Sequence, residues 1–215
     1  MNLLVVAKAP VAGRSKTRLC PPCTPEEAAA LAEAALADTL EAVAASGARP
    51  VLALDGEPGP WLPAGFRVLA QRGAGFDERL ANAWDDAGGP ALQIGMDTPQ
   101  VTADLLAEGL RALDAPGTDA VLGRAADGGW WSLGLRRPDR RMLLGVPMSA
   151  PTTGRAQLAR LRRRGLCVRA LPELRDVDSF EDALAVAALV PATRFGRGVR
   201  ALVGSAATDA PATGP

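Results

Sequence analysis

The sequence contains no histidine, no tyrosine and only three cysteines in 215 residues. Because histidine is the commonest general base, proton transfer in any catalysis would fall to Asp or Glu, or be left to a metal. Cys20, Cys23 and Cys167 are too few for a disulfide framework, which is typical of a reducing compartment. Cys20 and Cys23 have C-x-x-C spacing, but a structural zinc site needs about four Cys or His ligands. We therefore expect two ordinary thiols rather than a metal or redox site.

Long apolar runs and an excess of charge are also missing. No run approaches the roughly 20 apolar residues of a membrane-spanning helix, and the first residues are strand-like rather than signal-like, so we expect a cytoplasmic protein. Lys and Arg together number 24, as do Asp and Glu. No overall field attracts nucleic acid or an anionic membrane, and any anion site must be built locally. The length and the 48% hydrophobic content predict a single domain with one sizeable core.

Short apolar runs alternate with amphipathic stretches, a pattern that predicts an α/β fold with a mostly parallel sheet and crossover helices. Strands are predicted over 2–7, 50–54, 66–70, 91–96, 118–123, 130–135 and 167–171. Helices are predicted over 24–47, 76–87, 102–113, 152–165 and 179–190. The first helix has the strongest local signals, since Thr24 and Glu27 form a capping box and Gly47 ends it. From Pro191 the composition becomes small and polar, which predicts a domain over 1–190 and a flexible tail over 191–215.

The first candidate site is the segment "KAPVAGRSKTRL", residues 8–19, which follows an apolar strand. It holds four cations and no acid: Lys8, Arg14, Lys16 and Arg18. Open α/β sheets bind ligands beyond the carboxyl ends of their strands, where cations and a glycine such as Gly13 suit phosphate oxygens. It is not a Walker A loop, because Ser15 and Pro10 stand where that motif needs glycine. The alternative is a solvated basic surface loop.

Two segments place carboxylates beside predicted elements. In "GMDTP", Asp97 is predicted as the last residue of a buried strand, where a carboxylate near phosphates can hold Mg²⁺ or Mn²⁺. The alternative is an Asx turn in which Asp97 accepts only from backbone amides. In "DVDSFEDAL", Asp176 and Asp178 precede a helix. Here an ordinary N-cap, formed by Ser179 with Asp182 or by Asp178 itself, explains the pattern equally well.

The segment "GRAADGGWWSLGL" joins two predicted strands through Asp127, Gly128 and Gly129. Asp-Gly-Gly is a common hairpin turn, which is one interpretation of these residues. Trp130 and Trp131 are adjacent and point to opposite faces of a strand, so at most one packs in the core in the ordinary way. The other interpretation is that Asp127 and one indole line an acceptor site, the carboxylate as a base and the ring as a stacking surface.

Together, "AKAPVAGRSKTRL", "GMDTP", "GRAADGGWWSLGL" and "LPELRDVDSFEDAL" resemble the four blocks of a bacterial GT-A-like transferase family. That family was formerly classed as a domain of unknown function, and its members are often labelled glycosyltransferases. More distantly, the chain is similar to 2-phospholactate and molybdenum-cofactor guanylyltransferases and to CMP-Kdo synthetases. The resemblance covers roughly residues 2–190 and implies a single-domain GT-A-like (Rossmann-like) fold. It also implies that the first loop holds donor phosphates, that Asp97 binds a divalent metal and that Asp178 supplies a second contact.

These observations predict a Mg²⁺- or Mn²⁺-dependent transferase that uses a nucleotide-activated donor. The preferred reaction is glycosyl transfer from a nucleotide sugar to a small-molecule acceptor. Nucleotidyl transfer of an NMP from an NTP to a phosphorylated or acidic small molecule makes nearly the same electrostatic demand, and a non-catalytic phosphate-binding module is the third interpretation. The expected roles are phosphate binding by Lys8, Gly13, Arg14, Lys16 and Arg18, catalysis by Lys16 and Asp127, acceptor binding by Gly128, Gly129, Trp130 and Trp131, and metal binding by Asp97 and Asp178.

Overall fold

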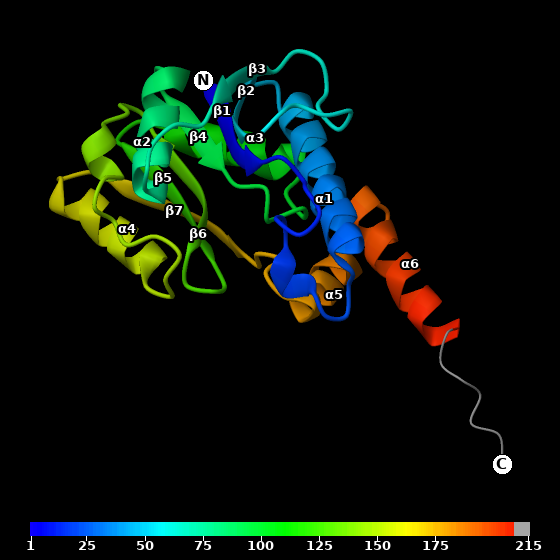
Figure 1. Cartoon of the computed structure of the whole chain (residues 1–215). Helices are drawn as coiled ribbons and strands as arrows, with labels where there is room; N and C mark the ends of the chain where they lie inside the picture. The colour runs from blue at the N-terminus through cyan, green and yellow to red at the C-terminus, as the bar shows by residue number, and fades with distance from the viewer. Residues whose placement is uncertain (209–215) are drawn as a thin grey trace.

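A seven-stranded sheet runs through the centre of the molecule in the computed structural model, which describes residues 1–208 (Figure 1). The strand order is β3-β2-β1-β4-β6-β5-β7. The strands are β1 (Asn2–Lys8), β2 (Arg49–Asp55), β3 (Arg67–Ala70), β4 (Ala91–Ile94), β5 (Ala120–Ala125), β6 (Trp130–Leu135) and β7 (Val168–Leu174). β6 runs antiparallel to both of its neighbours, and the other paired strands are parallel. The predicted mostly parallel α/β sheet is confirmed.

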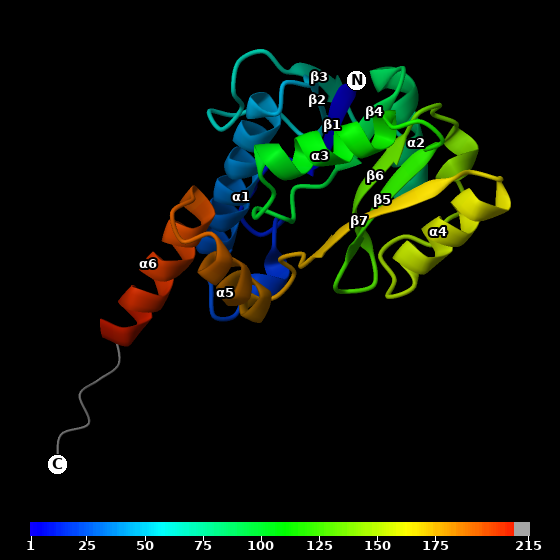
Figure 2. The ribbon, with the colours of Figure 1, turned by 180° about the vertical axis from the view of Figure 1, so that it is seen from behind.

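Helices cover both faces of this sheet (Figures 1 and 2). α1 (Pro25–Ala45) and α3 (Ala103–Asp114) pack on one face, and α2 (Phe76–Ala87) and α4 (Thr153–Arg163) on the other. β1 serves both layers, since Leu3 and Val5 join the first core while Leu4 and Val6 join the second. A strand buried on both faces needs apolar residues at every position, which is why β1 is a continuous apolar run. Within residues 1–208, no helix has the length and apolar character to span a bilayer.

Local sequence signals predicted the positions of most helices and strands. Thr24 and Glu27 form the predicted capping box at α1, where the Thr24 hydroxyl accepts from the Glu27 amide at 3.2 Å. β4 departs from the prediction at its end, because it stops at Ile94 rather than reaching Asp97. The ladders on both sides of β4 stop at Ile94, which pairs with Val5 of β1 and Ser132 of β6. Asp97 therefore lies in the following loop and is not the last residue of the strand.

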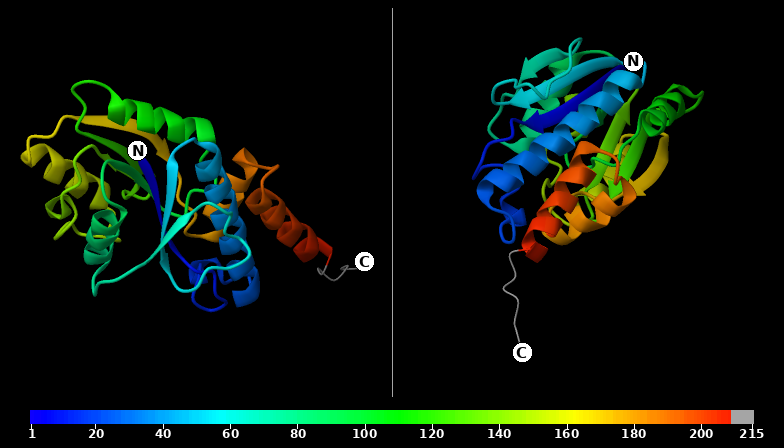
Figure 3. Two further views of the ribbon diagram at one scale, coloured as in Figure 1. Left: turned by 90° about the horizontal axis from the view of Figure 1, so that it is seen from above. Right: turned by 90° about the vertical axis from the view of Figure 1, so that its right-hand side faces the viewer.

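The C-terminal prediction requires a larger correction, because residues 194–208 form a helix, α6 (Arg194–Thr208), rather than a flexible tail. Residues 209–215 of the predicted tail lie outside the described residues. α6 follows α5 (Phe180–Leu189) and lies beside α1 (Figure 3). Phe195 and Val199, four residues apart, are buried in a third core between these helices.

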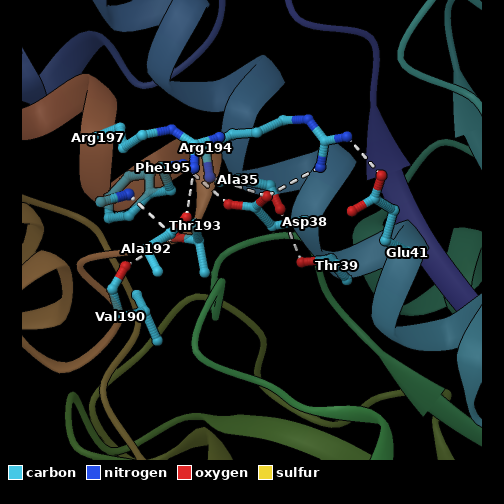
Figure 4. Close-up of polar contacts among 11 residues, drawn as sticks. Ala35, Asp38, Thr39, Glu41, Val190, Ala192, Thr193, Arg194, Phe195 and Arg197 are labelled. Atoms are coloured by element: carbon cyan, nitrogen blue, oxygen red, sulfur yellow. Dashed lines mark hydrogen bonds and ion pairs between the residues drawn. The ribbon is translucent and has the colours of Figure 1, made fainter.

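Asp38 of α1 also fixes the first turn of α6 (Figure 4). Its carboxylate accepts from the backbone amides of Arg194 at 3.2 Å and Phe195 at 2.8 Å. The same carboxylate forms an ion pair with the Arg194 guanidinium, which also contacts Glu41. These hydrogen bonds raise the pKa of Arg194, so the guanidinium stays charged and α6 is tied to α1 by charge as well as by packing.

Candidate active site

The carboxyl ends of the parallel strands meet at one edge of the sheet, and the antiparallel β6 begins at the same edge. Strand order reverses between β1 and β4, the position at which open α/β sheets bind ligands. The loops at this edge enclose two adjoining cavities of about 580 Å³ and about 300 Å³. Five residues line both cavities, which are therefore two chambers of one crevice: Val6, Arg18, Phe76, Asp97 and Asp178.

The smaller cavity, here called the basic chamber, is lined by all four predicted cations: Lys8, Arg14, Lys16 and Arg18. The loop that carries them leaves β1 and is braced from within. The Ser15 hydroxyl accepts from the Val11 amide at 3.0 Å and donates to the Ala9 carbonyl at 3.3 Å. Gly13 has a φ of +73° and lies at the exposed tip of the loop, lining neither chamber in the described structure. The four predicted cations therefore lie at one cavity.

Lys16 links three loops at the floor of the basic chamber. Its side chain is only 10% exposed, and its ammonium forms an ion pair with the Asp97 carboxylate and donates to the Val177 carbonyl oxygen. The Val177 amide in turn donates to the Asp97 carbonyl at 2.8 Å. The segments that follow β1, β4 and β7 are thus joined through one ammonium and one backbone hydrogen bond.

Val177 also explains why two carboxylates face the crevice. Its side chain is buried in the third core, and its neighbours in an extended chain point the other way. Asp176 lines the larger cavity and Asp178 lines both, with an Asp178 oxygen 3.5 Å from the Arg18 guanidinium. Ser179 is the N-cap of α5 and pairs with Asp182, so the capping interpretation is right for those residues and leaves Asp178 free for the crevice.

Asp176 was not among the predicted site residues, although the alternation of Asp176, Val177 and Asp178 was the available signal. Its Oδ1 atom is buried and has no hydrogen-bond partner within residues 1–208. Burial raises the pKa of Asp176 to about 7, and the negative charges of Asp97 and Asp127 act in the same direction. Such an oxygen can accept from a ligand or contact a cation.

The chemistry of these side chains fits a divalent cation. Mg²⁺ and Mn²⁺ prefer oxygen ligands, and Mg²⁺ usually takes one or two carboxylates together with substrate phosphates and waters. Asp97 and Asp178 stand between the basic chamber and the larger one, and the unpartnered oxygen of Asp176 is a further possible ligand. Within the described residues, no group of three or more Asp, Glu or Cys is placed to hold a metal. Phosphates and water would therefore complete the coordination shell.

The larger cavity, here called the aromatic chamber, is lined by both tryptophans and by Asp127. Asp127 lies in the turn between β5 and β6, where its Oδ1 accepts from the Gly129 amide at 2.7 Å. Asp127 and Gly129 therefore make the predicted turn and also line the chamber. Gly128 instead packs behind it, in the described structure lining neither chamber, and its carbonyl accepts from the Gly154 amide of α4 at 2.8 Å.

The two tryptophans divide as predicted from strand alternation. Trp131 is buried in the first core and donates from its Nε1 to the Pro172 carbonyl at 2.9 Å. Trp130 is half-buried on the opposite face and packs against the second core. Its Nε1 is buried without a hydrogen-bond partner in residues 1–208, as is the hydroxyl of Thr98 in the same chamber. Trp130 is thus the indole with an unused donor at the cavity.

Several solved structures have a fold similar to that of this chain. A protein from Desulfovibrio desulfuricans G20, provisionally assigned as a nucleotide-diphospho-sugar transferase, has a TM-score of 0.84 at 23% identity, over 94% of this chain and 95% of its own. A nucleotidyl transferase from Methanothermobacter thermautotrophicus has a TM-score of 0.55 at 19% identity, over 86% and 95%. Rv0371c from Mycobacterium tuberculosis H37Rv, in complex with manganese, has 0.50 at 22%, over 86% and 97%. These likenesses confirm the predicted GT-A-like, Rossmann-like fold.

Sequence comparison adds the family. No curated protein matches the chain. The profile of the family described as "uncharacterized protein conserved in bacteria (DUF2064)" matches residues 28–150, which is more than half of the chain and includes Asp97 and the Asp127 turn. The chain therefore belongs to this bacterial family, in agreement with the resemblance seen in its four sequence blocks.

Proposed function

We propose that the protein is a metal-dependent transferase with a nucleotide-activated donor, and that it transfers a glycosyl group from a nucleotide sugar to a small-molecule acceptor. One observation carries the proposal: four cations and the carboxylates of Asp97 and Asp178 line a single crevice at the carboxyl edge of the sheet. The fold shared with a protein provisionally assigned as a nucleotide-diphospho-sugar transferase, and with a manganese-bound protein, supports it. A module that only binds phosphate has no need of metal-ligand carboxylates beside its cations.

In this proposal the donor diphosphate binds in the basic chamber. The charges of Lys8, Arg14, Lys16 and Arg18 would stabilise the departing nucleoside diphosphate, and a divalent ion held by Asp97 and Asp178 would supply Lewis-acid stabilisation of the same group. Asp127 would accept the proton of an acceptor hydroxyl as that oxygen bonds to the anomeric carbon and the bond to the diphosphate breaks. Trp130 would position the acceptor or the sugar by stacking.

Nucleotidyl transfer remains the second candidate, because four cations around one chamber of about 300 Å³ also suit a triphosphate. In that reaction the same groups would stabilise the α-phosphoryl group and the departing pyrophosphate. The two candidates differ in the ligand that binds and in the bond that breaks.

A thermal-shift titration of nucleotide sugars against nucleoside triphosphates, with and without Mn²⁺, tests the proposal. A ligand at about a hundred times its Kd adds roughly 2.7 kcal/mol of stability, or about 5–10 °C for a chain of this size. We expect a Mn²⁺-dependent shift with one nucleotide sugar. A shift with a triphosphate alone would favour nucleotidyl transfer, and no Mn²⁺-dependent shift with any nucleotide would refute the proposed function.

Carboxylate variants connect that shift to the site. Asp97→Asn keeps the shape of the side chain but removes its charge, and should abolish the Mn²⁺-dependent part of nucleotide binding in a calorimetric titration. Asp178→Asn should weaken it less, because water can replace a second contact. Asp104→Asn, an exposed carboxylate in the first turn of α3, is the matched control and should leave binding unchanged. Binding of Mn²⁺ and nucleotide by the Asp97 variant at wild-type strength would rule out this metal site.

A further inference from the structure

Charge is divided unequally between the two chambers. The charged residues common to both are Arg18, Asp97 and Asp178. The basic chamber adds three cations, namely Lys8, Arg14 and Lys16, and no anion of residues 1–208. Among the described residues, the aromatic chamber adds two carboxylates and no cation, namely Asp127 and Asp176. The crevice thus changes sign from one chamber to the next.

The geometry points to an acceptor that is an uncharged or positively charged hydroxyl compound, and not a phosphorylated or carboxylated one. This inference rests on the proposed function, in which the donor diphosphate fills the basic chamber and the acceptor enters the aromatic chamber. A divalent ion would neutralise charge at Asp97 and Asp178, but the Asp127 carboxylate would still face the acceptor, with Asp176 beside it. An anionic acceptor would meet like charges, which is unfavourable in a site partly shielded from water.

The other groups that commonly bind anions are already engaged. Arg18 is the one cation of the described residues at the aromatic chamber, and its guanidinium is mostly exposed and directed to Asp178 at 3.5 Å. α4 begins at this chamber, and a helix N-terminus can bind phosphate through free amides. Here the amide of Thr153 donates to the Ala150 carbonyl at 2.9 Å and that of Gly154 to the Gly128 carbonyl at 2.8 Å. Two amides in the first turn of α4 therefore already have protein partners.

The walls of the aromatic chamber suit a molecule with hydroxyl groups and an apolar face. Phe76, Trp130 and Met148 supply apolar surface. The Trp130 indole nitrogen and the Thr98 hydroxyl are buried polar groups without partners in residues 1–208, and each would gain a hydrogen bond from a bound hydroxyl. A sugar ring or a polyol presents both kinds of surface, and an amino sugar would also meet the two carboxylates favourably.

Ligands with one ring and different charges test the inference. The probes are methyl glucoside, glucosamine, glucose 6-phosphate and glucuronate. They are titrated by saturation-transfer NMR into the full chain with diamagnetic Mg²⁺ and the nucleoside diphosphate chosen by thermal shift. We expect the first two to bind at least about tenfold more tightly than the last two. Asp127→Asn should bring the affinity for the phosphorylated probe closer to that for the neutral one, whereas Asp104→Asn should not. Equal or tighter binding of the anionic probes would overturn the inference.

A second measurement tests the sign of the electrostatic potential in the aromatic chamber even when no hexose binds. The Trp61→Phe variant is compared with the same variant carrying Trp130→Phe as well, and the difference in fluorescence is the contribution of Trp130. The other two tryptophans, Trp84 and Trp131, are buried in both proteins. Caesium should quench that contribution more strongly than iodide, and Asp127→Asn should reduce the preference. Stronger quenching by iodide would refute an acidic chamber. Because this test uses no nucleotide, its failure is distinct from failure of the proposed donor binding.

Discussion

Replacing Lys16 by methionine is expected to change metal binding and nucleotide binding in opposite directions. In the structure the Lys16 ammonium contacts the Asp97 carboxylate and the Val177 carbonyl, so a metal ion that binds Asp97 must first displace it. Methionine keeps the length and apolar stem of the side chain and removes the charge. The variant therefore leaves Asp97 without its internal cation, and it also leaves the donor phosphates without one of their four.

The size of each effect follows from how exposed the Asp97 side chain is and from which group the Lys16 ammonium contacts. The Asp97 side chain is 45% exposed, so its ion pair with Lys16 is partly screened and is worth about 0.5–1 kcal/mol. Removing that competitor should strengthen the binding of Mn²⁺ alone by about two- to fivefold. A charge-assisted hydrogen bond from Lys16 to phosphate is worth about 1.5–3 kcal/mol. Its loss should weaken nucleoside diphosphate binding by roughly 10- to 100-fold.

Calorimetric titration of Mn²⁺ alone, and then of a nucleoside diphosphate in saturating Mn²⁺, measures both effects on the same protein. Lys8→Met is the matched control, because Lys8 lines the same chamber and has an exposed side chain with no ion pair in the described residues. It should weaken nucleotide binding and leave Mn²⁺ binding unchanged. If Lys16→Met leaves the affinity for Mn²⁺ unchanged or lowers it, the ammonium does not compete with the metal and the reasoning is refuted.

Three further predictions concern the scaffold. Asp38→Ala should lower the free energy of unfolding in urea by about 2–3 kcal/mol, because an 8% exposed carboxylate no longer caps α6 and Arg194 keeps only its exposed partner Glu41. Glu41→Gln, at 57% exposure, should cost under about 1 kcal/mol. Burial acts to raise the pKa of Asp182, but hydrogen bonds from Ser179 outweigh it and lower that pKa below 3.8. The carboxylate therefore stabilises the fold above pH 3.8, and this contribution is lost as the pH falls through the lower pKa of the folded state. The loss of unfolding free energy caused by Asp182→Asn should accordingly be smaller at about pH 3 than at about pH 7. Gly117→Ala should destabilise the fold by about 1–2 kcal/mol, because its positive φ is unfavourable for alanine. Gly128→Ala should cost more, because it has a positive φ as well and its new Cβ would lie 2.0 Å from the Pro151 carbonyl oxygen. Equal costs within any of these pairs, or a pH-independent deficit, would contradict the corresponding argument.

Most of the fold could be predicted because its signals are local. The capping box of Thr24 and Glu27 indicated the start of α1, and the continuous apolar run over 2–7 indicated that β1 is buried on both faces. The placement of cations at the crevice followed from one rule, that ligands bind at the carboxyl ends of parallel strands. That rule needs only the order of elements along the chain, which the sequence reveals.

The misses have non-local causes. α6 is held by Asp38, which lies 156 positions before Arg194, and by burial of Phe195 against helices that a composition argument does not see. Phe195, Val199 and Leu202 have the spacing of an amphipathic helix, but a short helix is marginal in water without the partners that bury such a face. The end of β4 at Ile94 was missed for a similar reason, since a strand ends where its neighbours stop pairing and not where its apolar run stops.

The position of Asp97 shows why this difference matters for chemistry. A carboxylate at the end of β4 itself would be held in place by the backbone hydrogen bonds of the sheet. Asp97 lies three residues beyond Ile94 and is instead held by other loops, through the Val177 amide and the Lys16 ammonium. The same Val177 turns Asp176 and Asp178 toward the crevice. Asp97 and Asp178 therefore stand where the basic chamber meets the aromatic one. Under the proposed function, the bond that breaks must join a group held by cations to a group that faces carboxylates, and this boundary is where the two can meet.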